Sequence, residues 1–522
     1  MPALRPLFDR PGARWYNLRA QRPGLSAGHK GGVPLSTALD LTRPAGFFSR
    51  CGYAVYLAIT LLVLGLYVFR GPHTALVALL CVVGLLAGVP LLSFLGGVGE
   101  RLGWKRSLVL LLALCFVLKL AWVLLVRIDP QGDYQVFYDH AVAFSQQETL
   151  GGSRYLALFP HIFGYSFFLS LVMKAFGTSY LVAPITNVVL STLSCALLFF
   201  LCRRLGGLKT AVVACGLWIV FPSQIIYNMF ALSEPLYTTL LLAVLLLFAV
   251  FDQRSETVAP LPTALLGLGA GALLALVNLC RPVAAILIIG LVLWLALVRL
   301  DGWREKKFRR SALLFLAGVL VCYVAVGQAG NAYLAYRIGE EPSSVPGYNI
   351  MVGFNQDSGG TWNQADSDLL YSFSGEEGAT ASYAQEQMLQ AAVERITSGE
   401  IDFVRLMLDK VYTFLCRDDS CVMYAQSVLR HTGLFFLLCN GFYYITLILA
   451  AVGAVDAFRR KDRSALFLVM VYFVGLTLAH MLVEVAGRYH YSLLIPLVVL
   501  GAKGALVLAD WGGKLWKAHK RA

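Results

Sequence analysis

The chain has 522 residues, of which 58% are hydrophobic and only 14% are charged. A soluble domain usually carries about 25% charged residues, so this composition excludes a water-exposed globular surface. The formal net charge is +13, but the Lys and Arg residues gather in short segments between apolar runs, as in loops retained in the cytoplasm. The charge therefore predicts membrane orientation, and we expect no nucleic-acid partner.

Residues 1–50 are polar and basic and contain no early apolar run of the kind found in a cleavable signal peptide. We expect a poorly ordered cytoplasmic tail. Thirteen candidate membrane segments follow it. They are 53–70, 75–97, 108–126, 160–176, 180–201, 210–222, 229–251, 263–280, 282–298, 311–328, 433–455, 464–483 and 491–509.

The basic clusters fix the orientation, because Lys and Arg favour the cytoplasmic side. If all thirteen segments cross, the cluster between Arg304 and Arg310 falls outside. Removing one crossing between residues 127 and 203 returns every basic cluster to the inside. Segment 160–176 is the weakest, since it begins at Pro160-His161 and carries Lys174. We predict that it lies along the outer surface as an amphipathic helix, which leaves twelve spans with both termini inside.

The polar stretch 329–432 then lies outside, and we expect a helix over 379–398 within it. Cys416 and Cys421 lie together in this stretch. An extracytoplasmic location allows a disulfide between them, and two free thiols fit the sequence equally well. Asp366-Ser-Asp368 has the D-x-D form that holds a metal in nucleotide-sugar enzymes, but no βαβ unit surrounds it, and we expect no metal.

The first outer loop places Asp129, Asp133 and Asp139 near a membrane edge. A carboxylate in a low dielectric has a raised pKa, which suits a general base. The alternative is a solvated loop that only avoids positive charge. Glu234 lies just inside the outer end of an apolar segment. An acidic residue at that depth usually faces a polar cavity, although lipid headgroups can also solvate it, and we expect Pro235 to loosen the helix end.

Two arginines, Arg281 and Arg488, lie at outer helix ends against the positive-inside trend. Either can hold a phosphate through paired hydrogen bonds. For Arg488 an ion pair with Glu484, four residues earlier, is the alternative. Lys119, near the outer end of the third segment, either extends outward or pairs with a loop carboxylate.

In the large loop, Asn355 and Trp362 belong to a glycine-rich stretch that joins amides to aromatic rings. Amides bond sugar hydroxyls and rings stack on sugar faces, so this stretch suits sugar recognition. A loop with several turns has the same composition.

In this order the residues resemble the GT-C superfamily of integral-membrane glycosyltransferases. The nearest likeness is to family 39, the bacterial relatives of protein O-mannosyltransferases and lipid A aminoarabinose transferases. The resemblance runs from about residue 108 to 509. Its motifs are Asp133 with Tyr138, Phe159-Pro160-His161 with Gly164-Tyr165, Ser233-Glu234-Pro235, Arg281-Pro282, and Glu484 with Arg488-Tyr489.

The resemblance implies an all-α polytopic bundle of about twelve membrane helices with juxtamembrane helices in the first outer loop. We expect a tail (1–50), two added helices (51–107), a core (108–328) with a catalytic loop (127–180), an outer loop (329–432) and C-terminal helices with a tail (433–522). The expected location is the plasma membrane, with the site on the extracytoplasmic face.

The resemblance also implies transfer of one sugar, with inversion, from a polyprenyl-phosphate donor to a lipid, glycan or protein acceptor. Asp133 matches the family's base. Relatives often have two adjacent acids there, whereas this chain has Asp133-Tyr134, so Asp129 is a rival. No metal or other cofactor is expected. The remaining candidates are Arg488, Arg281 and Lys119 for the donor phosphate, and Glu234, His161, Tyr165, Asn355, Trp362, Tyr489 and Glu484 for substrates.

Two other classes remain as alternatives. A polymerase or ligase of lipid-linked glycans also combines many spans with a large outer loop. A lipid or glycan transporter is expected to show inverted repeats and charges near the bilayer midplane, whereas the embedded charges here cluster at outer helix ends.

Overall fold

The computed structural model describes residues 41–146, 150, 153–255 and 259–520. The predicted tail lies outside the described residues as far as Asp40, and the first described helix begins at Thr42. The described part of the chain consists of helices and connecting turns, without strands. This architecture confirms the predicted all-α class.

Nine helices among the described residues are long and apolar enough to cross a membrane. They are α2 (Thr42–Arg70), α3 (Thr74–Leu102), α4 (Trp104–Leu125), α8 (Val182–Val220), α10 (Glu234–Arg254), α11 (Pro260–Cys280), α13 (Lys306–Ile338), α19 (Thr432–Arg460) and the continuous run of η5 (Gly487–Leu493) with α21 (Leu494–His519). Three shorter apolar helices accompany them. They are α7 (Ile162–Phe176), α12 (Ala284–Leu293) with η3 (Trp294–Val298), and α20 (Leu466–Leu482).

Helix α8 is a hairpin of two helices. Its backbone leaves the helical region at Gly207, where φ is 84°, a conformation that glycine adopts without strain. Beyond this point the chain turns back: Cys215 Sγ donates to the Cys195 carbonyl at 3.4 Å and Trp218 Nε1 donates to the Ser191 carbonyl at 3.3 Å. The two halves correspond to the predicted segments 180–201 and 210–222.

The shorter helices α12–η3 and α20 connect opposite ends of the bundle. Helix α12 follows Arg281, which faces Glu234 at one end, and η3 is followed by Arg299, which pairs with Asp252 at the other. Helix α20 begins beside Asp252, which accepts a hydrogen bond from the Ala465 amide at 2.8 Å. When both shorter helices and the two halves of α8 are counted, twelve apolar helical segments connect the two ends of the bundle among the described residues, the number of spans that the sequence predicts.

Helix α7 lies at the loop end of the bundle, beside α5 and the end of α11. Gly164 at its start packs against the backbone of Leu279 and Cys280, and Thr178 beyond its end accepts a hydrogen bond from Tyr138 of α5. The exposed residues of α7 are Leu171, Lys174, Ala175 and Phe176, so its exposed side combines apolar side chains with one charge, and its position along the outer surface stays a prediction.

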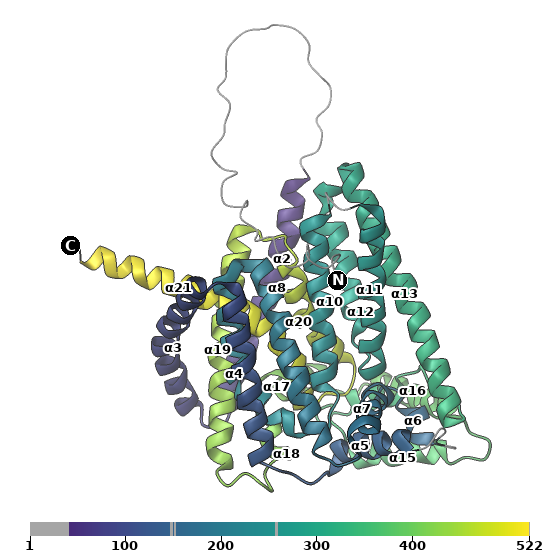
Figure 1. Cartoon of the computed structure of the whole chain (residues 1–522). Coiled ribbons are helices and arrows are strands. Elements are labelled where there is room, and N and C mark those ends of the chain that lie inside the picture. The colour runs from purple at the N-terminus through teal and green to yellow at the C-terminus, as the bar shows by residue number, and fades with distance from the viewer. Residues whose placement is uncertain (1–40, 147–149, 151–152, 256–258, 521–522) are drawn as a thin grey trace, which may run out of the picture.

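The remaining helices gather at one end of the bundle, the lower end in Figure 1. Those of the first loop are α5 (Gly132–Gln146) and α6 (Arg154–Leu158); those of the large loop are α14 (Gly347–Gly353), α15 (Gln364–Ser374), α16 (Ala381–Thr397), α17 (Phe403–Leu415) and α18 (Ser420–Tyr424). Helix α16 matches the helix predicted over 379–398. Two single turns, α9 (Pro222–Ile226) and η2 (Tyr227–Met229), precede α10, and η4 (Leu300–Arg304) precedes α13.

Two details, at α13 and Pro235, differ from the sequence-based expectations, and a third, at Cys416 and Cys421, matches one of two alternatives that the sequence left open. Helix α13 continues to Ile338, ten residues beyond the predicted span, because it projects into the loop region. Cys416 and Cys421 are free and buried, and Cys416 points toward the Val63 carbonyl, 3.7 Å away. Pro235 lies in the first turn of α10, where no backbone hydrogen bond is lost, so it starts the helix rather than loosening it.

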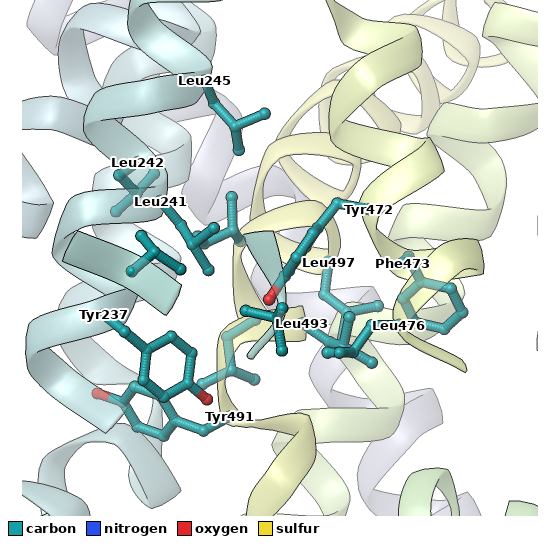
Figure 2. Close-up of a cluster of buried hydrophobic side chains, with 14 of the residues drawn as sticks. Tyr237, Leu241, Leu242, Leu245, Tyr472, Phe473, Leu476, Tyr491, Leu493 and Leu497 are labelled. Atoms are coloured by element: carbon teal, nitrogen blue, oxygen red, sulfur yellow. The ribbon is translucent and has the colours of Figure 1, made fainter. Parts of the chain in front are cut away.

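Small residues bring the helices into close contact. An added Cβ at Gly267 or Gly271 of α11 would meet the α13 backbone at Phe315 or Val319 within 2.4 Å, the type of contact that drives helix association in membranes. Inside the bundle, next to the loop end, α10, α20 and α21 enclose a cluster that includes Tyr237, Leu241 and Tyr472 (Figure 2). This cluster supports the residues described next.

Candidate functional site

Four charged side chains from distant parts of the chain meet at the loop end of the bundle. Asp133 lies in the first turn of α5, Glu234 begins α10, Arg281 follows α11, and Arg488 lies in η5. All four were predicted site residues, and the structure brings them together through the ion pairs described below.

Arg488 is the centre of this group. Its Nη1 donates to Asp133 Oδ2 at 2.5 Å, and its Nε lies 3.9 Å from Glu234 Oε1. The arginine side chain is buried, whereas the Asp133 side chain is 49% exposed. Asp133 is therefore a carboxylate held by a fixed cation and still open to a ligand from outside the bundle.

Glu234 is nearly fully buried, with 1% of its side chain exposed. Arg281 lies 3.7 Å from its Oε1, yet neither carboxylate oxygen has a hydrogen-bond partner among the described residues. The hydroxyls of Ser233 and Thr238 on the same turns are also buried without a partner. Buried polar groups are normally satisfied, so this group of oxygens has the capacity to accept hydrogen bonds from a bound molecule.

Arg281 is positioned by its backbone and by a ring. Helix α11 ends at Cys280, and Arg281 is extended, with φ of −160° and ψ of 130°, as the residue before a proline prefers. Its guanidinium carbon lies 3.9 Å from the centre of the Tyr489 ring. The helix break predicted at Arg281-Pro282 therefore directs the Arg281 guanidinium toward the site, where it is the second cation beside Arg488.

The alternative ion pair between Arg488 and Glu484 is wrong. Residues 483–486 are not helical, so a spacing of four does not bring the two side chains into register. Glu484 instead accepts a hydrogen bond from the Tyr489 hydroxyl at 3.2 Å. Burial raises the pKa of Glu484, and the charge of Arg488 and the hydrogen bond from Tyr489 only partly oppose that rise.

His161 lies beside the two arginines. Burial and the positive charges of Arg281 and Arg488 lower the pKa of His161 to about 3. The imidazole is therefore neutral at physiological pH and can donate or accept a hydrogen bond without adding a third cation to the site.

The segment that carries Arg488 is fastened to the large loop. The Glu484 amide donates to the Asn349 carbonyl at 2.8 Å, and the Val485 amide donates to the Gly360 carbonyl at 2.9 Å. Lys410 of α17 donates to the Gly353 carbonyl at 2.8 Å. The large loop therefore supports the site mainly through its backbone.

Asn355 and Trp362, the two side chains predicted to recognise sugar in this loop, have other surroundings. Asn355 donates to Asp366 at 3.0 Å, and Trp362 is largely exposed. Asp366 also pairs with Arg395 at 2.8 Å, so the Asp366-Ser-Asp368 motif anchors helices instead of standing free. Within the described residues, no group of three or more His, Cys, Asp or Glu side chains is placed to hold a metal.

Lys119 lies away from the charged cluster, contrary to its predicted role. It is fully buried, and its Nζ donates to Ser191 Oγ at 2.7 Å and lies 5.6 Å from the centre of the Trp218 ring. The side chain points into the α4–α8 contact, where the serine hydroxyl and the ring satisfy it, and no ion pair joins it to a loop carboxylate of the described residues.

Tyr165 and Asp129 also differ from the central group. Tyr165 is buried in α7, with its ring 5.6 Å from that of Phe137 in α5, and it joins these two helices. Asp129 is exposed before α5 begins. Of the two rival acids, Asp133 is the one that pairs with Arg488.

Two tyrosines that the sequence did not single out border the site. Burial, followed by the negative charge of Asp133, raises the pKa of Tyr155 in α6 to about 12. The ring centre of Tyr424 in α18 lies 6.0 Å from the Arg488 guanidinium carbon. Both residues are in short loop helices, and no spacing pattern relates them to Arg488, so the sequence offered no signal for them.

Together, the fold and the site define a polytopic helical membrane protein with paired arginines and carboxylates at its loop end. Residues 160–327 match the family model described as dolichyl-phosphate-mannose-protein mannosyltransferase. The matched part includes Glu234 and Arg281, and the match confirms the predicted resemblance to membrane glycosyltransferases. No curated protein matches the chain.

Solved structures match much of the chain at low identity and low TM-score. The oligosaccharyltransferase AglB from Archaeoglobus fulgidus, in complex with an inhibitory peptide and a dolichol-phosphate, matches 80% of this chain and 52% of its own, with 11% identity and a TM-score of 0.41. ArnT from Cupriavidus metallidurans, bound to undecaprenyl phosphate, matches 77% of this chain and 78% of its own, with 11% identity and a TM-score of 0.33. The chain spans about half the length of the archaeal protein.

Proposed function

We propose that the chain is a glycosyltransferase that moves a sugar from a polyprenyl-phosphate donor to an acceptor hydroxyl. The observation that carries this proposal is the placement of Arg488, buried between the half-exposed Asp133 and the buried Glu234, with Arg281 opposite Glu234. This arrangement supplies an accessible base, two cations for a leaving phosphate, and unsatisfied oxygens for sugar hydroxyls. The matched family is itself named for a polyprenyl-phosphate sugar donor.

In the proposed reaction, Asp133 accepts the proton of the acceptor hydroxyl. The acceptor oxygen attacks the anomeric carbon from the face opposite the phosphate, the bond from that carbon to the phosphate oxygen breaks, and the anomeric configuration inverts. The bonding electrons leave with the polyprenyl phosphate. Arg488 and Arg281 stabilise the charge that develops on this oxygen, and they do so more in the transition state than in the bound donor.

Donor binding and activation of the base are linked through Arg488. Without a donor, the guanidinium is hydrogen-bonded to Asp133, which occupies the carboxylate. A donor phosphate competes for the same guanidinium. When the phosphate takes up this hydrogen-bond donor, the Asp133 carboxylate is free to accept the hydrogen bond of the acceptor hydroxyl.

The acceptor reaches the site from the loop end. The basic clusters of the chain lie at the opposite end, and such clusters favour the cytoplasm. We therefore place the reaction on the extracytoplasmic face of the plasma membrane. The acceptor is a lipid, a cell-envelope glycan or a protein that presents a hydroxyl there.

The test uses the full chain in lipid nanodiscs supplied with polyprenyl-phosphate monosaccharides and membrane extracts as acceptors, with released polyprenyl phosphate as the readout. We expect Asp133→Asn to reduce release by at least about 100-fold. The exposed acids Asp129 and Asp139 provide matched controls, and D129N and D139N should remain active. Unchanged release by D133N, or loss only in D129N, contradicts the assignment of the base.

The same experiment separates the two other classes. Release of polyprenyl phosphate after transfer of a single sugar supports the glycosyltransferase. Transfer only of an oligosaccharide from a lipid-linked chain indicates a polymerase or ligase. Movement of an intact lipid-linked sugar between leaflets, without cleavage, indicates a transporter.

A further inference from the structure

The last turns of α21 leave the bundle. The first half of this helix is buried among its neighbours, whereas residues 510–520 are all exposed. In Figure 1 this C-terminal part, drawn in yellow, projects sideways from the upper part of the bundle, near the end of α3. No other helix covers these turns in the described part of the chain.

The exposed turns have two distinct faces. Trp511 and Leu515 are four residues apart on one face, 47% and 73% exposed, and Trp516, 62% exposed, lies on the other side of the helix near Lys520. Lys514 and Lys517 are three residues apart on the other face. Lys520 follows on the same side, with its Nζ 5.1 Å from the centre of the Trp516 ring.

A contact in the preceding turn places this helix end relative to the membrane. Lys503 lies 3.6 Å from Asp462, and Asp462 accepts a hydrogen bond from Ser464 beside the α19–α20 turn. This turn belongs to the end of the bundle opposite the candidate site. The exposed turns therefore begin where the α21 span ends, at the level of the bilayer surface on the basic side.

We propose that residues 508–520 form an interfacial helix that binds the headgroups of anionic phospholipids. Trp511 and Leu515 enter the boundary between headgroups and acyl chains, where tryptophan is preferred. Lys514, Lys517 and Lys520 contact lipid phosphates. Charge complementarity favours anionic over neutral lipids, because these turns carry Lys514, Lys517 and Lys520 but only one acid, Asp510. The surface lies at the end opposite Arg488, so the inference is independent of the proposed function.

The test measures hydrogen–deuterium exchange over residues 510–520 in the full chain. One sample is reconstituted in nanodiscs of phosphatidylcholine alone and another in nanodiscs with phosphatidylglycerol added. We expect exchange about tenfold slower with the anionic lipid, and we expect high salt to abolish the difference. The triple variant K514Q/K517Q/K520Q should exchange at the same rate in both lipids.

A matched control removes two other exposed lysines at the same end, Lys306 and Lys307 at the start of α13. K306Q/K307Q should keep the dependence on anionic lipid. Equal exchange of the unmodified chain in the two lipids overturns the proposal. Fast exchange in both nanodiscs together with slow exchange in native membranes also overturns it, because a protein partner would then cover this face.

Discussion

At the scale of single residues, the two buried arginines have different tasks. The Arg281 guanidinium carbon lies over the Tyr489 ring, 3.9 Å from its centre, and the side chain faces Glu234. Arg488 donates to Asp133 through Nη1, while its Nε is buried without a hydrogen-bond partner. Arg488 therefore has donor capacity left for a ligand oxygen, and its fork geometry is the feature that a lysine cannot reproduce.

This difference leads to a prediction for Arg488→Lys. The variant keeps the positive charge and the fold but loses the paired donors, so kcat/KM for the polyprenyl-phosphate donor should fall by about 100-fold. Arg405, exposed on α17 and 67% accessible, provides the control, and R405K should retain full activity. The measurement is the rate of polyprenyl phosphate release at several donor concentrations. Wild-type kcat/KM in R488K would show that charge alone is sufficient at this position.

The predicted role of Lys119 illustrates what a sequence cannot resolve at this scale. Its depth in the third apolar segment identified an unusual charge, and the structure confirms that the charge is buried. The direction of the side chain depends on Ser191 and Trp218, more than seventy residues away. No local pattern in α4 encodes that contact, so the partner could not be predicted.

At the scale of elements, η5 is fixed by buried polar contacts on the residues that follow Arg488. His490 Nδ1 lies 2.6 Å from the Phe414 carbonyl and Nε2 lies 3.0 Å from Asp418 Oδ1. Ser223 donates to the other Asp418 oxygen at 2.6 Å. Since Nδ1 must donate to a carbonyl, one further proton is shared between Nε2 and Asp418. This buried pair anchors the turn that presents Arg488.

Two substitutions of Asp418 separate the hydrogen bonds from the charge. In Asp418→Asn the amide can donate to Nε2 and accept from Ser223, so both contacts persist and Tm should change little. Asp418→Ala leaves His490 without its partner and should destabilise the protein by about 3–5 kcal/mol. Because Arg488 then loses its support, KM for the donor should rise in D418A and stay unchanged in D418N.

The measurements are thermal unfolding in nanodiscs and donor KM at a temperature where both variants are folded. An equal loss in the two variants would mean that the charge of Asp418 matters rather than the contacts. A lower Tm in D418A with an unchanged KM would limit the pair to a structural role.

The elements show which parts of the fold the sequence determines. Apolar runs of sufficient length identified the spanning helices, because a bilayer demands that length regardless of neighbours. The ends were less predictable. Helix α10 begins at Glu234 rather than residue 229, since the preceding residues form short turns. The extended backbone before η5 excludes the pairing of Glu484 with Arg488 that the sequence left as an alternative. Such boundaries depend on tertiary contacts.

At the scale of the whole molecule, the chain separates its charges between two ends. One end carries Arg299 paired with Asp252, and Arg463 paired with Asp301 at 2.8 Å. The other carries Asp133, Glu234, Arg281 and Arg488. The positive-inside trend predicted this separation from the sequence, because it depends only on which loops hold Lys and Arg. The meeting of the four site residues was implied by family resemblance, and contacts over hundreds of residues produce it.

The position of α7 decides whether this two-ended arrangement is also the membrane topology, because one additional crossing would reverse every later loop. Lys174 near the end of α7, Glu377 in the large loop and Lys306 at the start of α13 are all exposed.

If α7 lies on the outer surface, K174C and E377C should react with a membrane-impermeant maleimide on intact cells. K306C should react only after the membrane is opened. The background requires replacement of Cys51 and Cys322, because the other cysteines are buried. Labelling of K306C on intact cells, or failure of K174C to react there, would mean that α7 crosses the membrane. The candidate site and the basic clusters would then no longer face opposite sides, as the twelve-span arrangement requires.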